Sequence, residues 1–152
     1  MKKVLLAASS GGHLDEISNL DRLAEEHEVI LLTEKTDCGV KGWFRRVYCV
    51  PQVNRKEILC FPKLIANAFK SLWLLLKEKP QVVISTGALA TIPVCLIARL
   101  LGKRVIYIES FARIDSPSLT GKLLYKVATV TIIQWPELKQ FYPNAIYGGS
   151  IY

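Results

Sequence analysis

The most informative feature of this sequence is a glycine-rich turn that follows its first predicted strand. An apolar run over residues 3–8 leads directly into Ser9-Ser10-Gly11-Gly12-His13, and an amphipathic helix is predicted next, over Leu14–Glu26. A strand, a glycine-rich turn and a helix N-terminus together favour anion binding, because small residues let a ligand approach the backbone and free N–H groups face it. His13 adds a titratable group at the mouth of the turn. The feature predicts an enzyme that acts on a nucleotide, a phosphate or a sugar phosphate, without naming one.

The rest of the chain alternates between predicted strands and helices, which indicates an α/β fold with a doubly wound parallel sheet. Strands are expected at Glu28–Leu32, Val47–Val50, Val82–Ile84, Arg104–Ile108, Val130–Ile133 and Ala145–Tyr147, and helices at Ile58–Lys79, Leu89–Leu101 and Leu119–Ala128, with a short one from Pro136. Ligands of such sheets lie beyond the carboxyl ends of the strands. The segments expected there are Ser9–His13, the turn Ser85-Thr86-Gly87 with Ala88, Glu109-Ser110 and Gln134-Trp135.

One segment has the hydropathy of a membrane span. No residue between Lys79 and Arg99 is charged, and the stretch is close to the length that crosses a bilayer. Polar residues, a glycine and a proline interrupt it in the rhythm of a strand, a turn and a helix. The apolar run at 82–84 is typical of a parallel strand that is buried on both faces. We therefore expect a buried strand and helix here, and no transmembrane segment.

The positive charge of the chain is concentrated in one segment. The 152 residues have a formal net charge of +7, and Lys41–Lys79 alone holds nine basic and two acidic residues. In the helix predicted there, three lysines are spaced by seven and share one stripe beside a wide apolar surface, as in helices that lie in the plane of an anionic membrane. The residues expected to contact the membrane are Trp43, Phe44, Arg45, Arg46, Lys63, Lys70, Trp73 and Lys77. A core helix with a solvated lysine face is the other interpretation; nucleic acid is not expected as a partner, because no motif that binds it accompanies the charge.

Composition and missing motifs argue against several other classes. The chain is 51% apolar and 22% charged, which argues against disorder. Cys38, Cys49, Cys60 and Cys95 are too widely spread for a zinc knuckle or a CxxC pair, so no metal site is expected and the chain reads as cytosolic. No secretory signal, Ser-His-Asp order, P-loop lysine or HExxH motif is present.

Glu34 keeps one alternative function open. It follows the second predicted strand about twenty residues after the glycine turn, where a Rossmann dehydrogenase keeps its ribose-binding acid. The turn lacks the third glycine of that fingerprint, but a small NAD(P)-binding domain remains possible on the residues alone. Simple structural roles also compete at the site: Gly11-Gly12 can make a tight turn, His13 can cap its helix, and Glu109 can pair with Arg113.

Three runs of residues resemble a known family. They are Ser9-Ser10-Gly11-Gly12-His13, Ile108-Glu109-Ser110-Phe111-Ala112-Arg113-Ile114, and Gln134-Trp135-Pro136-Glu137-Leu138 with Tyr142-Pro143-Asn144. They look like the acceptor-side, membrane-recruiting subunit of the split N-acetylglucosaminyltransferase of oligosaccharide-lipid synthesis, and most like its bacterial counterparts in capsule and exopolysaccharide synthesis. The glycine turn is shared with the wider GT-B group of glycosyltransferases. Eukaryotic members usually carry an N-terminal membrane span, which this sequence lacks.

The resemblance implies that residues 1–152 are one Rossmann-like domain, the N-terminal half of a GT-B enzyme. A partner chain with the fold of the C-terminal half would hold the UDP-sugar donor, and this chain would bind the lipid-linked acceptor. His13 is the first candidate for general base and Glu109 the second. The implied substrate-binding residues are Ser10, Gly11, Gly12, Thr86, Gly87, Ser110 and Arg113.

The resemblance implies no metal and no cofactor other than the donor. The expected location is the cytoplasmic face of a membrane, as a peripheral protein that contacts anionic lipid. A non-catalytic scaffold that recruits and activates the partner transferase is the alternative role within the same family.

Overall fold

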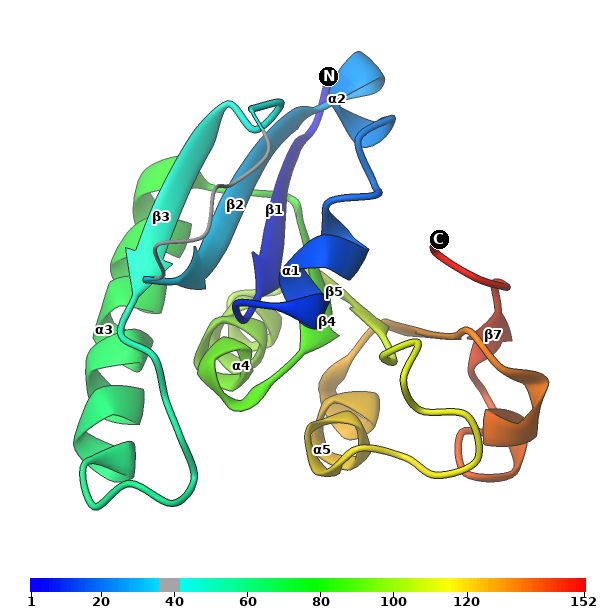
Figure 1. The fold of residues 1–152 in the computed structure, drawn as a ribbon. Helices are drawn as coiled ribbons and strands as arrows, with labels where there is room; N and C mark the ends of the chain where they lie inside the picture. Colours follow the sequence, from blue (N-terminus) through cyan, green and yellow to red (C-terminus); the bar gives the residue numbers. More distant parts are fainter. Residues whose placement is uncertain (36–41) are drawn as a thin grey trace.

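A seven-stranded parallel sheet forms the centre of the protein (Figure 1). The computed structural model describes residues 1–35 and 42–152, so the predictions for Cys38 and Lys41 lie outside the described residues. The strands are β1 (Lys3–Ala8), β2 (Glu28–Glu34), β3 (Arg46–Val50), β4 (Val82–Gly87), β5 (Arg104–Ile108), β6 (Val130–Ile133) and β7 (Ile146–Tyr147). Their spatial order is β3-β2-β1-β4-β5-β6-β7, and every neighbouring pair is parallel. The predicted doubly wound sheet is confirmed, with its switch point between β1 and β4.

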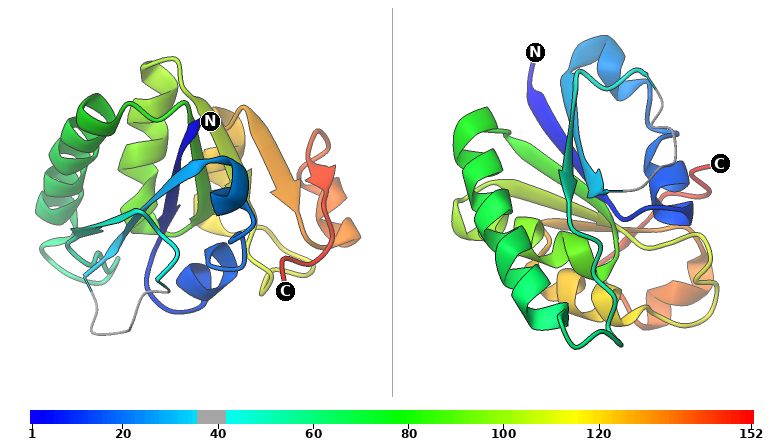
Figure 2. Two further views of the ribbon diagram at one scale, coloured as in Figure 1. Left: turned by 90° about the horizontal axis from the view of Figure 1, so that it is seen from above. Right: turned by 60° about the vertical axis from the view of Figure 1, so that its left-hand side comes forward.

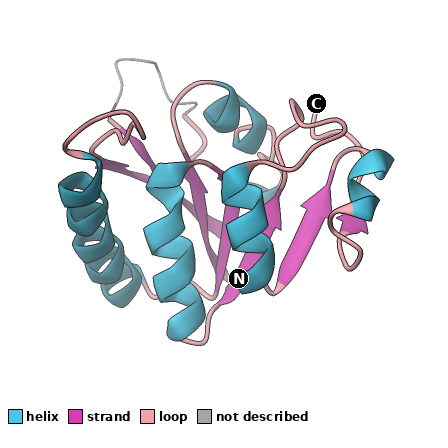
Figure 3. Ribbon diagram, turned by 90° about the horizontal axis from the view of Figure 1, so that it is seen from below, coloured by secondary structure: helices cyan, strands magenta, loops and turns pink. Residues whose placement is uncertain are grey.

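Helices cover both faces of the sheet. They are α1 (Gly12–Ile17), α2 (Leu23–Glu26), α3 (Cys60–Glu78), α4 (Ile92–Leu100) and α5 (Leu119–Val127), with short 3₁₀ helices η1 (Leu89–Thr91) and η2 (Pro136–Gln140). Figure 3 shows α3, α4 and α5 side by side over one face. Figure 2 shows α1 and α2 on the other side of β1 and β2.

Alternating residues of β1 separate the two cores that these helices cover. Leu5 and Ala7 belong to the cluster that includes Leu74 of α3 and Val94 of α4. The intervening residues belong to the cluster that includes Ile17 of α1. Successive side chains of a strand point to opposite faces, so an uninterrupted apolar run can serve both layers.

Two predicted elements differ from the structure. The helix expected over Leu14–Glu26 is divided into α1 and α2 by turns at Asn19 and Leu20, whose backbone N–H groups bond to Glu16 and Ile17. Short polar side chains such as Asn and Ser compete for backbone bonds and disfavour the helix interior. The turn expected at 85–87 is instead the end of β4, because the register with β1 extends to Gly87.

The uncharged stretch before Arg99 is confirmed as the buried strand β4 followed by the helix α4. Among the helices of the described residues, none is both long and apolar enough to cross a membrane.

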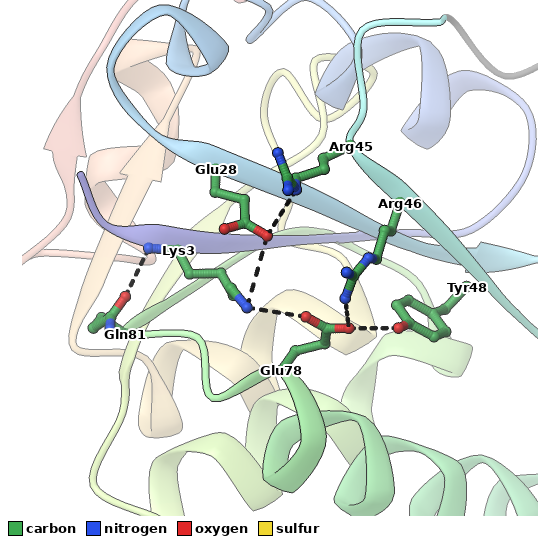
Figure 4. Close-up of polar contacts among 7 residues, drawn as sticks. All are labelled: Lys3, Glu28, Arg45, Arg46, Tyr48, Glu78 and Gln81. Carbon is green, nitrogen blue, oxygen red and sulfur yellow. Dashed lines mark hydrogen bonds and ion pairs between the residues drawn. The ribbon is translucent and has the colours of Figure 1, made fainter.

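A charged cluster lies at the amino edge of the sheet, opposite the strand ends that carry the candidate site. Glu78, at the end of α3, is buried, and Figure 4 shows it between side chains from β1 and β3. Its Oε1 accepts from Arg46 Nη1 at 2.7 Å and from the Tyr48 hydroxyl at 2.5 Å, and its Oε2 accepts from Lys3 Nζ at 3.1 Å. The Tyr48 hydrogen bond, followed by those from Arg46 and Lys3, outweighs the cost of burial and lowers the pKa of Glu78 to about 2. The cluster therefore fastens α3 to the sheet.

Candidate functional site

The carboxyl ends of β1, β4 and β5 surround a cavity of about 390 Å³. Residues that line it include His13 after β1, Ala88 after β4, and Ser110 and Arg113 after β5; Arg55 enters from the loop between β3 and α3. The cavity therefore lies at the switch point, where ligands of doubly wound sheets bind. Its size falls in the lower part of the usual range for small-molecule sites.

His13 is the candidate base that lines this cavity. It is the second residue of α1, after Gly11, whose φ of 77° suits glycine and turns the chain from strand to helix. The backbone oxygen of His13 accepts from the Thr86 hydroxyl at 3.0 Å, which ties α1 to β4. Its ring Nδ1 is buried and has no hydrogen-bond partner among the described residues. A buried nitrogen without a protein partner is typical of a group that acts on a ligand.

The lining of the cavity is cationic. Arg55 and Arg113 lie on it with His13, and the hydroxyl-bearing residues Ser110 and Ser118 add donors. No Asp or Glu is among the described residues that line it. Arginine binds phosphate oxygens in bidentate fashion, so the lining suits a phosphate or diphosphate group.

Strained backbone forms the wall at the end of β4. Gly87 has a φ of 98°, and Ala88 follows with φ 83° and ψ 153°, a conformation that side chains other than glycine rarely adopt. A Cβ at Gly87 would lie 3.4 Å from the Tyr107 ring and 3.9 Å from the His13 ring. The strain brings the backbone close to the histidine, as often occurs at functional sites.

Glu109, the second candidate base, lies in a different environment. It is 1% exposed and does not line the cavity. One carboxylate oxygen accepts from the Tyr107 hydroxyl at 2.8 Å, the other from the Tyr142 hydroxyl at 2.6 Å, and Ser118 donates its hydroxyl and its backbone N–H. Burial and, next, the nearby carboxylate raise the pKa of both tyrosines, so they remain donors. The pairing of Glu109 with Arg113 that the sequence also allowed is not among the ion pairs of the described residues.

The loop after β5 is tied to two other elements. Glu16 Oε1, on α1, accepts from the Ser110 hydroxyl at 2.9 Å and from the Phe111 backbone N–H at 3.0 Å. Gln134 Nε2 donates to the Glu109 backbone oxygen at 2.9 Å, and Trp135 Nε1 donates to the Phe111 backbone oxygen at 2.7 Å. The conformation of this loop, which carries Arg113, thus depends on α1 and on the residues that follow β6.

The predicted substrate-binding residues divide into two groups. Ser110 and Arg113 line the cavity, and Gly11 and Gly12 are exposed at its edge, at the start of α1. Thr86 and Gly87 are buried and support α1 and the strand end. Ser10 donates its hydroxyl to Glu34 at 3.2 Å.

The Glu34 carboxylate is occupied by the protein. One oxygen accepts from Ser10, and the other accepts from the Val53 backbone N–H at 3.1 Å. Glu34 is 5% exposed, so it holds two loops together rather than offering an open carboxylate to a ribose. This environment counts against the NAD(P)-binding alternative.

The residues predicted to contact a membrane do not share one surface. Phe44 is 9% exposed, stacks on Trp43 at 3.9 Å between ring centroids and packs in the core beneath α1. The prediction for Phe44 is therefore wrong, because the strand that follows it brings the ring under the sheet. Arg45 and Arg46 pair with Glu28 and Glu78.

The lysines of α3 are also engaged with the protein. Lys63 pairs with Glu57, Lys70 donates to the Cys49 backbone oxygen, and Lys77 lies 4.4 Å from the centroid of the Trp73 ring. The exposed surface of α3 is instead apolar: Phe61, Ile65, Phe69, Leu72, Trp73 and Leu76 are between 37% and 77% exposed. Apart from Trp73, the site prediction did not include them.

Several residues of the site were missed by sequence reasoning. Arg55 was counted as membrane charge, and Tyr107, Ser118 and Tyr142 carried no signal of their own. Gly121 did carry one, because a glycine inside a predicted helix calls for a packing reason. A Cβ at Gly121 would lie 2.2 Å from Glu109 Oε2, so only glycine lets α5 approach the carboxylate.

The class of fold is clear from solved structures. MurG of Acinetobacter baumannii superposes with a TM-score of 0.72 at 21% identity, over 90% of this chain and 43% of that protein. A UDP-N-acetylglucosamine 2-epimerase from Rickettsia bellii gives a TM-score of 0.78 at 15% identity, over 99% of this chain and 45% of the other. The chain thus has the Rossmann-like α/β fold found in GT-B glycosyltransferases and epimerases, and it spans less than half the length of these two proteins.

The sequence comparisons identify the family. The family model described as "Oligosaccharide biosynthesis protein Alg14 like" matches residues 21–151. The human protein named UDP-N-acetylglucosamine transferase subunit ALG14 is 30% identical over 97% of this chain and 82% of its own length. The protein of the same name from Yarrowia lipolytica is 37% identical, over 94% of this chain and 65% of its own length. The chain belongs to the Alg14-like family of oligosaccharide biosynthesis proteins.

Membership confirms the prediction that the chain is a glycosyltransferase subunit, since the relatives carry that name. The predicted closeness to bacterial capsule proteins finds no support in the relatives named here, which come from an animal and a yeast.

Proposed function

We propose that this chain is the acceptor-side subunit of a two-chain glycosyltransferase and that His13 is its general base. The donor would be a UDP-sugar held mainly by a partner chain with the fold of a GT-B C-terminal half, and the acceptor would be a lipid-linked sugar. The observation that carries the proposal is the imidazole of His13, which lines a cationic cavity at the switch point with a buried Nδ1 that lacks a protein partner. The names of the relatives favour N-acetylglucosamine as the sugar transferred. No cofactor beyond the donor is proposed.

In the proposed reaction a neutral His13 accepts the proton of the acceptor hydroxyl. The hydroxyl oxygen bonds to the anomeric carbon of the donor as the bond from that carbon to UDP breaks, and UDP leaves with inversion of configuration. Arg113 would stabilise phosphate charge at the same cavity. Glu109 would be a positioning residue, because donors of the protein already occupy both of its oxygens.

The experiment that tests this role compares two histidine variants. The complex is purified through an affinity tag on this chain, and transfer from labelled UDP-N-acetylglucosamine to a lipid-linked sugar is measured. His13→Ala should lower kcat by about 10²- to 10⁴-fold, as expected for loss of a general base. His27→Ala, whose ring Nδ1 contacts only the Glu26 backbone oxygen and lies outside the cavity, should keep full turnover. Full turnover of an assembled His13→Ala complex would favour the scaffold role instead.

The same proposal places the protein peripherally on the cytoplasmic face of a membrane. The support for this is the apolar surface of α3, where Phe61, Ile65, Phe69 and Leu72 recur at helical spacing and are all exposed. Lysines of the same helix would approach anionic lipid. In vesicle sedimentation, Phe69→Glu should reduce binding to anionic vesicles by about 10-fold or more, from the loss of one buried aromatic ring.

A matched control distinguishes this surface from general hydrophobicity. Phe141→Glu makes the same change at an exposed phenylalanine after η2, and it should leave vesicle binding unchanged. Equal losses in the two variants would contradict the assignment of the surface to α3.

The pathway is proposed only at the level of oligosaccharide-lipid synthesis, which the family description supports. A role in capsular or exopolysaccharide repeat-unit synthesis stays a prediction from the sequence. The two pathways make different demands on the acceptor, so the acceptor lipid that this complex uses would decide between them.

A further inference from the structure

The cationic cavity is continuous with a second cavity of about 570 Å³ between the first turn of α3 and the start of α5. Four residues line both: Arg55, Leu89, Leu119 and Thr120. No element separates the two, so one elongated ligand could occupy both of them.

The two cavities have opposite chemistry. The first is lined by His13, Arg55 and Arg113 with hydroxyl groups. The second is lined mainly by apolar side chains, among them Ile58, Phe61, Leu64 and Leu123. Its one acid, Glu57, is paired with Lys63. A molecule that fits both must have an anionic end and a hydrocarbon end.

Arg55 lies at the junction. Its Nη2 donates to the Thr120 hydroxyl at 3.4 Å, and no carboxylate pairs with it among the described residues. Thr120 is 5% exposed and so fixes one end of the arginine without neutralising its charge. The guanidinium can therefore bind an anionic group at the point where the polar lining ends.

The apolar cavity opens toward the exposed surface of α3. Ile58 and Phe61, which line it, are 98% and 77% exposed, and Phe61 begins the apolar row that continues along the helix. A hydrocarbon chain that leaves the cavity at this end would meet the surface proposed above to contact lipid.

We infer that the two cavities form one site for a lipid diphosphate, with the diphosphate between Arg55 and Arg113 and the first part of the hydrocarbon chain between α3 and α5. The inference rests on the proposed function for the identity of the ligand as acceptor. It adds the residues that recognise the lipid: Arg55 reads the junction between head group and chain, and Leu119 and Leu123 contact the chain. The sugar attached to the diphosphate would then lie on the His13 side.

Equilibrium dialysis of the full chain with labelled farnesyl diphosphate tests the inference. Unlabelled inorganic diphosphate, farnesol and UDP serve as competitors. Farnesyl diphosphate should bind at least 10-fold more tightly than inorganic diphosphate or farnesol, because each of these fills one cavity. UDP should compete no better than inorganic diphosphate.

Two variants and two matched controls assign the halves. Arg55→Gln should weaken farnesyl diphosphate binding about 10-fold or more, as for loss of a charged hydrogen bond, and leave farnesol binding unchanged. Leu123→Gln should weaken farnesyl diphosphate and farnesol about 3- to 10-fold, since the side chain is partly exposed, and leave inorganic diphosphate unchanged. Arg99→Gln and Leu100→Gln, exposed residues of α4 outside both cavities, should alter nothing.

Equal affinity for farnesyl diphosphate and inorganic diphosphate would overturn the inference, as would tighter binding of UDP than of farnesyl diphosphate or an unaltered Arg55→Gln protein. Circular dichroism establishes that each variant is folded, and Arg113→Gln provides a second removal of charge. Because the assay measures binding without turnover, its failure would leave the role of His13 standing. Loss of that role would likewise leave a positive binding result intact.

Discussion

Replacing Glu78 by Gln isolates the contribution of one buried negative charge to stability. The substitution keeps the size of the side chain and an acceptor for Tyr48, and it removes the charge that Arg46 and Lys3 neutralise (Figure 4). The pKa of Glu78 falls from its usual 4.5 to about 2, chiefly through the Tyr48 hydrogen bond.

The size of the effect follows from that pKa. A fall from 4.5 to about 2 is equivalent to about 3 kcal/mol of stability at neutral pH, as an upper value. The Arg46 side chain is 49% exposed and the Lys3 side chain 25% exposed, so water screens the attraction. We therefore expect Glu78→Gln to lower the free energy of unfolding by about 1–2 kcal/mol at pH 7.

The effect has a defined pH window. A carboxylate whose pKa is lowered in the folded state stabilises it fully above the unfolded value, near 4.5, and loses this effect as the pH falls toward about 2. Urea unfolding followed by tryptophan fluorescence at pH 7 and at lower pH measures the difference between wild type and variant. The difference should shrink steadily below pH 4.5. Glu25→Gln, an exposed glutamate on α2, is the control and should change stability little at either pH. A deficit of the same size at pH 7 and near pH 2 would refute the electrostatic reasoning.

Three further substitutions test the packing around the site. Gly121→Ala should destabilise the protein by about 2 kcal/mol or more in urea unfolding, because the new Cβ would lie 2.2 Å from Glu109 Oε2. Tyr142→Phe, which removes the 2.6 Å donor to the same oxygen, should cost about 1–3 kcal/mol, and an unchanged midpoint would contradict the view of Glu109 as a buried hub. Ala88→Gly should raise stability by about 1 kcal/mol through relief of its positive φ of 83°; a loss of stability would mean that this conformation is not strained.

Local patterns in the sequence were sufficient to predict most of the fold. The runs at 3–8 and 82–84 are apolar without interruption, and both form central strands. The rule that strand ends share one edge brought His13 and Ser110 to the same cavity. These predictions succeeded because they depend on period and direction, which are encoded within a few residues.

Contacts between distant segments were not predictable in the same way. Phe44 is aromatic beside two arginines, and only the pairing of β3 with β2 brings it into the core. Glu109 looked like a free acid, because Tyr142, which donates to it, lies 33 residues further along. Arg55 looked like surface charge until the loop before α3 brought it to the cavity.

The central position of β1 has a consequence for synthesis of the chain. Its neighbours are β2, which follows closely, and β4, whose first contact joins Lys3 to Gln81 across 78 residues. During translation β1 and β2 leave the ribosome long before β4 does, so the apolar edge of β1 must wait without its partner. Closing so distant a pair is slow and leaves an exposed strand edge open to wrong partners. Nascent chains that end before Val82 should therefore depend on chaperones, and those that extend past Gly87 should begin to resist proteases.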